Sequence, residues 1–443
     1  MRQWRAGIRV DSPRIARDNP RPMKRPFLVL LALAAMLAPA ASCQCSGNKK
    51  ERVESLAERS LRLENGLQVD LVAGPCSDSA ALVVLMNVGI DHDPPGRSGM
   101  ANLAGRVLAT MAAAGRAERS VETGNDFTLY SVVAAGDRLL DEVGEAAAWM
   151  SQVAPTEADL SRERARLLEE LGKLSGADAS LTAVSLAEEA LQPTRGGGKR
   201  LGVTSEVEAI TLAELQAFWQ AHFKPGNARI TVAGRFDAEK VRARIEAAFA
   251  PLPAGTPPVA REAADATVKG TLVMGDTPTA VAVAVPAPAT KDPLYAPFLV
   301  LAARLMEKPA QARTWEASYD PMKRPEVLFI TGPVGEGEQP EPAAARIRAE
   351  AAAILAQPPA PGDTVRARER FRLLLEPHLL DPSVCAKDSR AFAVARARRA
   401  QLPLEGAPLM QALEATSKEQ LEEAARLFEP KRTAAVIAGG AIR

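Results

Sequence analysis

The sequence predicts an α+β protein made of two homologous domains in tandem. Three observations support this prediction: strand-like and helix-like hydrophobic patterns alternate along the chain, a proline-rich segment divides it, and a motif on one side of that segment recurs on the other. The chain has 443 residues, 47% of them hydrophobic and 25% charged, which is the composition of a globular protein with a sizeable core.

The elements of the first domain follow from local patterns. Hydrophobic residues alternate around Asn65-Gly66 and predict a β-hairpin over residues 61–72. Further apolar runs predict strands at 80–88, 127–134 and 228–233. Apolar residues at helical spacing predict helices at 98–114, 139–153, 157–174, 212–223 and 238–249. Together these elements predict a domain over residues 60–250.

A linker and a repeat predict the second domain. Residues 251–267 begin PLPAGTPP and lack hydrophobic periodicity, which is typical of a linker. Beyond them, residues 416–439 align without gaps on 211–234, and each copy has a helix, a Phe-x-Pro turn, an apolar strand and a glycine. We therefore predict that residues 268–443 form a duplicate of the first domain. Chance similarity between two helix–strand junctions is the alternative.

Residues 1–42 have the pattern of a secretory signal. Basic residues precede an apolar run at 27–37 that is shorter than the roughly 20 residues needed to span a bilayer. Small residues then lead to Cys43, as in a bacterial lipobox, so we predict that Cys43 carries lipid and that residues 43–59 form a tether. Ordinary signal cleavage before Cys43 is the alternative. The expected location is the bacterial cell envelope, with the protein lipid-anchored to the outer membrane and facing the periplasm.

Composition excludes several other classes. The formal net charge is +1 and no basic cluster interleaves with aromatic residues, so we expect no nucleic-acid partner. Three His and four Cys do not make a zinc ribbon or a scaffold of several disulfides. Because His92, His222 and His378 lack the spacing of a metal-binding pair, we predict that all three are structural or solvated.

Three segments resemble one known family. LENGLQV at 63–69, NVGIDHDPPGRSGMANL at 87–103 and HFKPGNARITVAG at 222–234 are similar to segments of the insulinase/pitrilysin-type zinc peptidases, the inverzincins. The resemblance implies that each domain is a mostly antiparallel sheet with helices packed on one face, and that the two domains face each other as a clam shell.

The resemblance also shows which residues are missing. The family's H-x-x-E-H helix supplies two zinc-binding His and a Glu that takes a proton from metal-bound water. The matching positions here are Asn102, Gly105 and Arg106, which provide a poor ligand, no side chain and no lone pair, respectively. We therefore predict a degenerate metal site with no catalytic residue, no metal and no cofactor.

Two later glutamates match the rest of that site. By the resemblance, Glu170 is the third zinc ligand and Glu163 the outer-shell carboxylate, although the match requires a deletion within 114–126. We predict that Arg106 forms a salt bridge with Glu170 and that Asn102 lies nearby. The alternatives are that the glutamates belong to a solvated helix face and that Arg106 points to solvent.

The second domain offers a weaker match. The resemblance implies that Arg313 and Tyr319 grip the backbone of a substrate, although their spacing is one residue short; the plain interpretation is a surface helix end.

The sequence thus predicts a catalytically silent envelope lipoprotein that binds a peptide or a partner. The expected partners are an active paralogous peptidase subunit and an extended peptide added to a strand edge at 127–134. Two alternatives stay open: an active metallopeptidase with an unrecognised metal site, and a purely structural envelope scaffold.

Overall fold

The computed structural model describes residues 57–74, 78–111, 119–151, 155–177, 179–191, 202–256, 271–274, 277–307, 313–321, 327–371, 388–401 and 406–439. The predicted signal, Cys43, His378 and most of the predicted linker lie outside these residues. None of the helices in the described ranges is long and apolar enough to cross a membrane.

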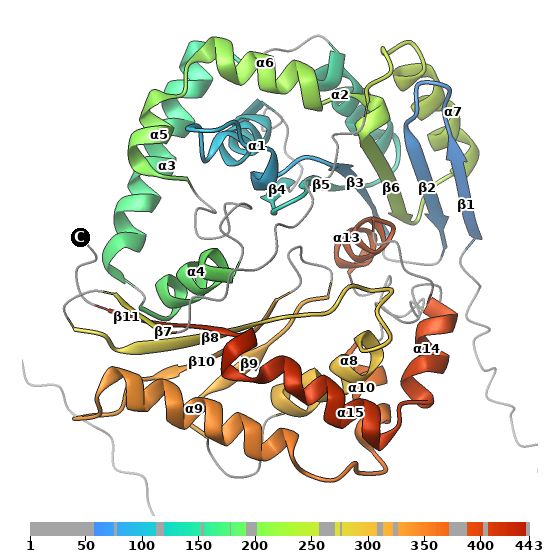
Figure 1. Ribbon diagram of the computed structural model, residues 1–443. Helices are drawn as coiled ribbons and strands as arrows, with labels where there is room; N and C mark the ends of the chain where they lie inside the picture. The colour runs from blue at the N-terminus through green and yellow to red at the C-terminus, as the bar shows by residue number, and fades with distance from the viewer. Residues whose placement is uncertain are drawn as a thin grey trace, which may run out of the picture. The chain divides into compact units, whose positions relative to one another are not determined.

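Two sheets share one topology (Figure 1). The first has the order β1-β2-β6-β3-β5-β4 and the second β7-β11-β8-β10-β9, so the second repeats the first without a counterpart of β1. In each sheet one pair is parallel, β2 with β6 and β7 with β11, and the other pairs are antiparallel. The first sheet consists of β1 (Ala57–Arg62), β2 (Gln68–Ala73), β3 (Ala80–Met86), β4 (Arg119–Thr123), β5 (Thr128–Ala134) and β6 (Ala228–Gly234). The second consists of β7 (Thr271–Met274), β8 (Ala280–Pro286), β9 (Glu316–Ser318), β10 (Val327–Pro333) and β11 (Ala434–Ala438).

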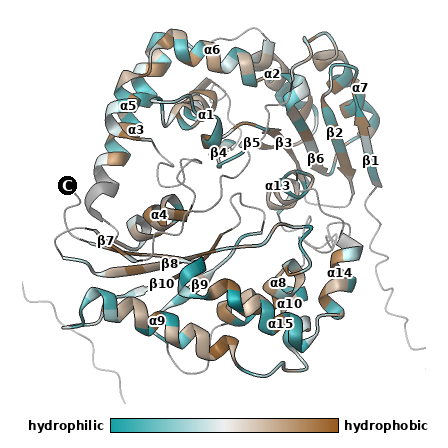
Figure 2. Cartoon of the chain, viewed as in Figure 1, coloured by the Kyte–Doolittle hydropathy of each residue, from teal (hydrophilic) through white to brown (hydrophobic). Residues whose placement is uncertain are grey.

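Helices flank both sheets. Those of the first half are α1 (Met100–Met111), α2 (Asp137–Ser151), α3 (Glu157–Ala177), α4 (Ala179–Leu191), α5 (Thr204–Ala209), α6 (Leu212–His222) and α7 (Ala238–Phe249). Those of the second half are α8 (Tyr295–Met306), α9 (Pro340–Leu355), α10 (Asp363–Arg370), α13 (Ser389–Arg399), α14 (Gly406–Glu414) and α15 (Lys418–Ala425). The central strands are largely hydrophobic, whereas most of the helices mix hydrophilic and hydrophobic residues (Figure 2), because one side of such a helix faces solvent.

The duplicated unit is present in both halves. Each copy is a helix, a 3₁₀ turn that begins at the shared proline, and a strand at the centre of a sheet. In the first copy Thr211 and Glu214 form a capping box at the start of α6. In the second the box is formed by Ser417 and Gln420, so α15 begins one residue later than the gapless alignment places it. The sequence repeat is therefore a structural repeat rather than chance similarity.

Each half lends one helix to the other half's sheet. Helix α4, from the first half, packs on β8 and β11, and helix α13, from the second, packs on β3 and β6. Small side chains allow the first of these close contacts: Ala183 and Ala187 of α4 share a buried cluster with Ala282 and Ala284 of β8. The prediction of helices on one face only was therefore incomplete, because the opposite face is apolar too and needs its own cover.

Two further predictions need correction. Strand β5 lies between β3 and β4, so residues 127–134 are not a sheet edge; the edge strand is β4, which the sequence analysis did not predict. The predicted tether, 43–59, ends too late, because β1 already begins at Ala57. The predicted hairpin is present, with Gly66 in the left-handed region at φ +91°.

Candidate functional site: a degenerate metal site

A carboxylate fixes the start of α1. Asp93 accepts hydrogen bonds from the backbone N–H groups of Gly99 (2.6 Å) and Ala101 (2.7 Å), which would otherwise lack partners in the first helical turn. Helix α1 then packs between α3 and β4. This packing sets Asn102, Gly105 and Arg106 between a helix and an edge strand.

Arg106 and Glu170 form a bidentate ion pair. Nη1 of Arg106 lies 3.0 Å from Oε1 of Glu170, and Nη2 lies 2.6 Å from Oε2. The arginine also donates from Nε to Oδ1 of Asn102, one helical turn earlier, at 3.0 Å. The predicted salt bridge is therefore present, with Asn102 beside it, and the alternative that Arg106 points to solvent without an acid is wrong. The two side chains are 22% and 47% exposed, so the pair is open to water on one side.

Glu163 of α3 lies in the same contact between α1 and α3, next to Thr110 of α1. Its residue is 3% exposed, and its Oε1 accepts hydrogen bonds from Thr110 Oγ1 (2.7 Å), Arg162 Nε (3.2 Å) and Arg166 Nη1 (2.8 Å). A buried carboxylate with two cations and a hydroxyl on one oxygen is fully satisfied without a metal. Glu163 is thus not part of a simply solvated helix face.

At Gly105, α1 closely approaches β4. A Cβ built on this glycine would lie 2.5 Å from Thr123 Oγ1 and 3.3 Å from Val121 Cγ1. Both neighbours belong to β4, so the strand occupies the space next to the helix where a larger residue would project. The glycine therefore does more than remove a carboxylate; it lets the edge strand pack directly on α1.

The residues present do not fit zinc. Arg106 places a permanent cation on Glu170, the only one of the matched positions that could donate a carboxylate to a metal. In the described part of the chain, no group of three His, Cys, Asp or Glu residues is placed to hold a metal ion. The guanidinium supplies the positive charge that a carboxylate in this position requires, and its fork matches the two oxygens. That these residues are the remnant of a metal site stays an interpretation of the sequence resemblance.

The two described histidines have structural environments. Nδ1 of His92 accepts a hydrogen bond from the backbone N–H of Gly89 at 3.1 Å. His222 packs on Phe218, with ring centroids 4.5 Å apart, and burial lowers the pKa of its imidazole.

Arg313 and Tyr319 have partners inside the second half. Arg313 lies over the Trp315 ring, 4.1 Å from its centroid, and donates to the backbone oxygen of Leu305 at the end of α8. Tyr319 is 5% exposed and packs edge-to-face on Phe298. The interpretation of this segment as a surface helix end is wrong, because Tyr319 follows the strand β9 and is buried. Their role in gripping a substrate stays a prediction.

Sequence reasoning missed Thr110 and the strand β4. Thr110 follows Arg106 by four residues, so helical spacing alone places it on the same face of α1. Strand β4 is short and mostly polar, and its residues alternate between half-buried and exposed. Its sequence alone therefore gives little indication of a strand when its partner β5 is not considered.

A family model and several solved structures are similar to this chain. Residues 209–319 match a family model described as the peptidase M16 inactive domain. No curated protein matches the chain. A protease from Helicobacter pylori superposes with a TM-score of 0.70 at 16% identity, over 87% of this chain and 100% of that chain.

Two further solved structures have the same fold. The peptidase M16 inactive domain from Pseudomonas fluorescens has a TM-score of 0.69 at 16% identity, over 87% of this chain and 98% of that one. The first half of the periplasmic protease PqqL from Escherichia coli has a TM-score of 0.64 at 18% identity, over 87% and 92%.

The chain therefore has the two-domain α+β fold of the M16 peptidases, the insulinase/pitrilysin type, and the predicted fold class is confirmed. The resemblance seen in the sequence agrees with it: residues 209–319 match the M16 inactive-domain model, the fold is that of M16 peptidases, and the sequence contains no H-x-x-E-H motif.

Proposed function

We propose that this protein is a catalytically silent insulinase-type homologue of the bacterial cell envelope that binds an extended peptide segment, either a free peptide or part of an active paralogous peptidase. The observation that carries the proposal is the Arg106–Glu170 pair beside Gly105: the fold is kept, while two residues that the sequence resemblance aligns with metal ligands form a salt bridge. The match to an inactive-domain model and the similarity to a periplasmic protease support the class and the compartment.

The edge strand β4 is the surface we assign to the peptide. Among the described residues it pairs only with β5, so its other side presents backbone groups to which a strand can add. It also borders the degenerate site through Thr123 and Gly105. A peptide bound there would lie next to residues that cannot cleave it.

Restoring the ligands tests the assignment of the site. The Asn102→His/Arg106→His variant places two imidazoles four residues apart on one helix face, with Glu170 opposite. We expect it to bind one zinc ion per chain, measured by metal analysis after dialysis, whereas the parent protein binds none. The same variant with Glu170→Gln is the control and should bind much more weakly. Zinc in the parent protein would favour an active metallopeptidase instead.

Two proline variants test the edge. Consecutive N–H groups of a strand point in opposite directions, so of Ser120→Pro and Val121→Pro one removes a donor from the β4–β5 ladder and the other a donor from the free side. The ladder variant should lose thermal stability. The free-side variant should keep its Tm and lose binding to a labelled decapeptide library and to a co-purifying peptidase. A parent protein that captures neither would favour a purely structural scaffold.

Cys43 carries the prediction about localisation. If it is lipidated, Cys43→Ala should move the protein from the membrane fraction to the soluble fraction and remove the mass of the acyl chains. Fractionation followed by intact-mass spectrometry measures both. A variant that stays in the membrane fraction with unaltered modification contradicts the prediction.

A further inference from the structure

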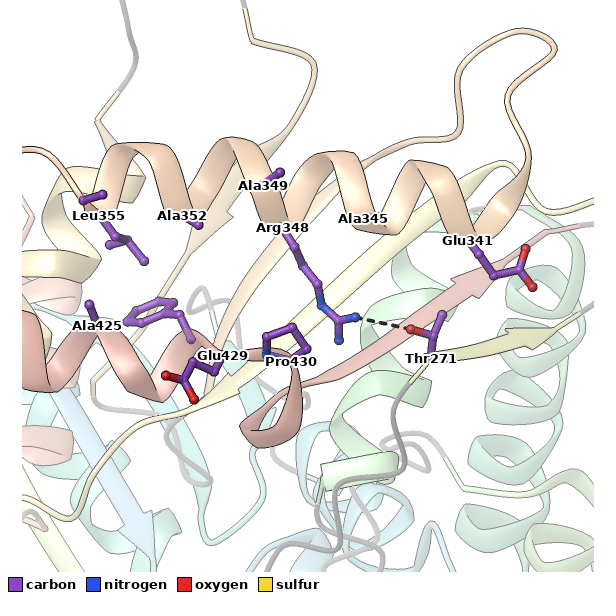
Figure 3. Close-up of a pocket in the computed structure, with 12 residues that line it drawn as sticks. Thr271, Glu341, Ala345, Arg348, Ala349, Ala352, Leu355, Ala425, Glu429 and Pro430 are labelled. Carbon is purple, nitrogen blue, oxygen red and sulfur yellow. Dashed lines mark hydrogen bonds between the residues drawn. The ribbon is translucent and has the colours of Figure 1, made fainter.

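The second half has a groove beside α9, whose lining residues are drawn in Figure 3. It encloses a cavity of about 530 Å³ between α9, the turn that follows α15, and the start of β7. Much of its lining is small or apolar, and Ala345, Ala349 and Ala352 form one stripe along α9. The polar lining residues are Thr271, Arg348 and two carboxylates, Glu341 and Glu429. A stripe of alanines lets another backbone approach closely.

A guanidinium without a counterion lies in this groove. Arg348 donates to Thr271 Oγ1 and Thr433 Oγ1, both at a long 3.3 Å, and its Nε is buried without a hydrogen-bond partner. Among the described residues no carboxylate forms an ion pair with it. Burial lowers the pKa of Arg348, which reflects the cost of keeping the charge there. Glu341 and Glu429 line the same groove but form no ion pair with Arg348, so an occupant gains most by placing a carboxylate at this guanidinium.

The first half shows what covers the equivalent surface. Phe223 and Pro225 of the duplicated unit are buried, whereas their counterparts Phe428 and Pro430 are half-buried and exposed. In the first half α7 packs on α2, and its Phe249 belongs to the same buried cluster as Phe223. Among the described residues of the second half no helix packs on α9 in this way; its main contacts are with α8 and the strands of its own sheet.

The surfaces of α2 and α9 differ at a position that contacts the docked helix. Helix α7 packs on α2 where Gly144 leaves room for Arg244, whose Nε donates to the backbone oxygen of Leu140 at 3.1 Å. When α2 and α9 are aligned on the buried residues Val143 and Ile347, Arg348 takes the position of Gly144. A helix that docks on α9 as α7 docks on α2 would therefore place the residue corresponding to Arg244 next to Arg348.

We propose that the α9 groove binds an amphipathic helix of a partner chain, with large apolar residues at the spacing of Val241, Ile245 and Phe249 and a carboxylate facing Arg348. This site is separate from the β4 edge, so it does not depend on the proposed peptide binding. The argument combines charge complementarity at Arg348 with the docked helix that the same chain carries in its first half.

A charge-swap experiment tests the proposal on the full chain. The probe is a synthetic, fluorescein-labelled peptide of residues 237–250 carrying Arg244→Glu, held helical by a lactam between positions 239 and 243, which are exposed in α7. Fluorescence anisotropy should show binding to the parent protein and at least a tenfold loss for Arg348→Glu, with Arg348→Gln in between. The matched peptide with native Arg244 should show the reverse order, binding the Arg348→Glu protein more tightly than the parent.

Circular dichroism first establishes that each variant is folded, which is expected because Arg348 contributes only two long hydrogen bonds. Binding of either peptide that does not depend on residue 348 overturns the proposal, and so does the absence of binding by both. Binding that appears only after residues 257–268 are deleted would place the chain's own linker on the groove. Arg348-dependent binding of oleate in place of the peptides would make the site one for a small amphiphile. Either result would overturn the proposal that the groove binds a helix of a partner chain.

Discussion

At the scale of single residues, two arginine–glutamate pairs in the first half share their chemistry and differ in burial. The side chains of Arg106 and Glu170 are 22% and 47% exposed, whereas those of Arg119 and Glu142 are 6% and 2% exposed. Water competes for the first pair and weakens it, but the second is closed off, and removal of one partner would leave a buried charge.

We therefore predict that Arg106→Ala lowers the free energy of unfolding by about 1 kcal/mol or less, and that Arg119→Ala lowers it by about 3–5 kcal/mol. Urea unfolding of the two variants measures both values. Arg106→Ala costs little because solvent replaces the guanidinium as the partner of the half-exposed Glu170. The burial argument fails if Arg106→Ala proves as costly as Arg119→Ala.

His222 makes stability depend on pH. Burial lowers the pKa of its imidazole below the ordinary 6.5, so the unfolded chain binds a proton more readily than the folded one. Protonation of His222 therefore does not reduce the free energy of unfolding above about pH 6.5, and this free energy falls as the pH drops below that value. Thermal melts between pH 7.5 and 5.5 should show this fall, and His222→Gln should reduce it. Carboxylates with a lowered pKa, such as Glu214, cause a further loss of stability when they are protonated at more acidic pH. A variant with the same pH dependence as the parent would exclude His222 as the cause.

At the scale of elements, local patterns predicted most of the first half and failed where an element depends on distant partners. The hairpin at Asn65-Gly66 and the duplicated Phe-x-Pro unit are specified within a few residues, so they could be predicted. The strand β4 and the role of α4 could not, because an alanine-rich helix gives no sign of which sheet it covers. The Arg106–Glu170 contact could be predicted only because the family resemblance aligned two helices that are far apart in the chain.

The close approach of α1 and β4 gives a prediction at this scale. A Cβ on Gly105 would collide with Thr123, so Gly105→Ala should destabilise the protein by about 1–3 kcal/mol despite alanine's better helix propensity. Gly172 in α3 is the matched control, since nothing lies within 4 Å of its Cβ position; Gly172→Ala should stabilise by about 0.5–1 kcal/mol. Chemical denaturation compares the two. Equal effects would show that β4 does not press on α1.

At the scale of the whole molecule, the exchanged helices α4 and α13 join the two halves, because each packs on the sheet of the other half. Each covers an apolar face of the other half's sheet, which the helices of that half do not cover. The halves are duplicates in topology, yet neither sheet is buried on both faces without the other half.

Limited proteolysis tests this view. We predict that the first cut falls between residues 251 and 266, where prolines interrupt regular hydrogen bonding. The nicked chain should still elute as one particle in size-exclusion chromatography, and the two fragments should separate only in urea, because α4 and α13 remain in place. A first cut within 212–233, or fragments that separate in native buffer, would contradict the domain map.

The exchange of helices also sets an order of events during translation. The first sheet is complete when β6 ends at Gly234, but α13, which covers its apolar face, begins only at Ser389. At about 5–20 residues per second, the ribosome needs on the order of ten seconds to make the intervening chain. For that time the nascent protein exposes a sheet face that attracts other strands and hydrophobic surfaces. We therefore expect the newborn chain to need a holding chaperone until α13, which ends at Arg399, has been synthesised.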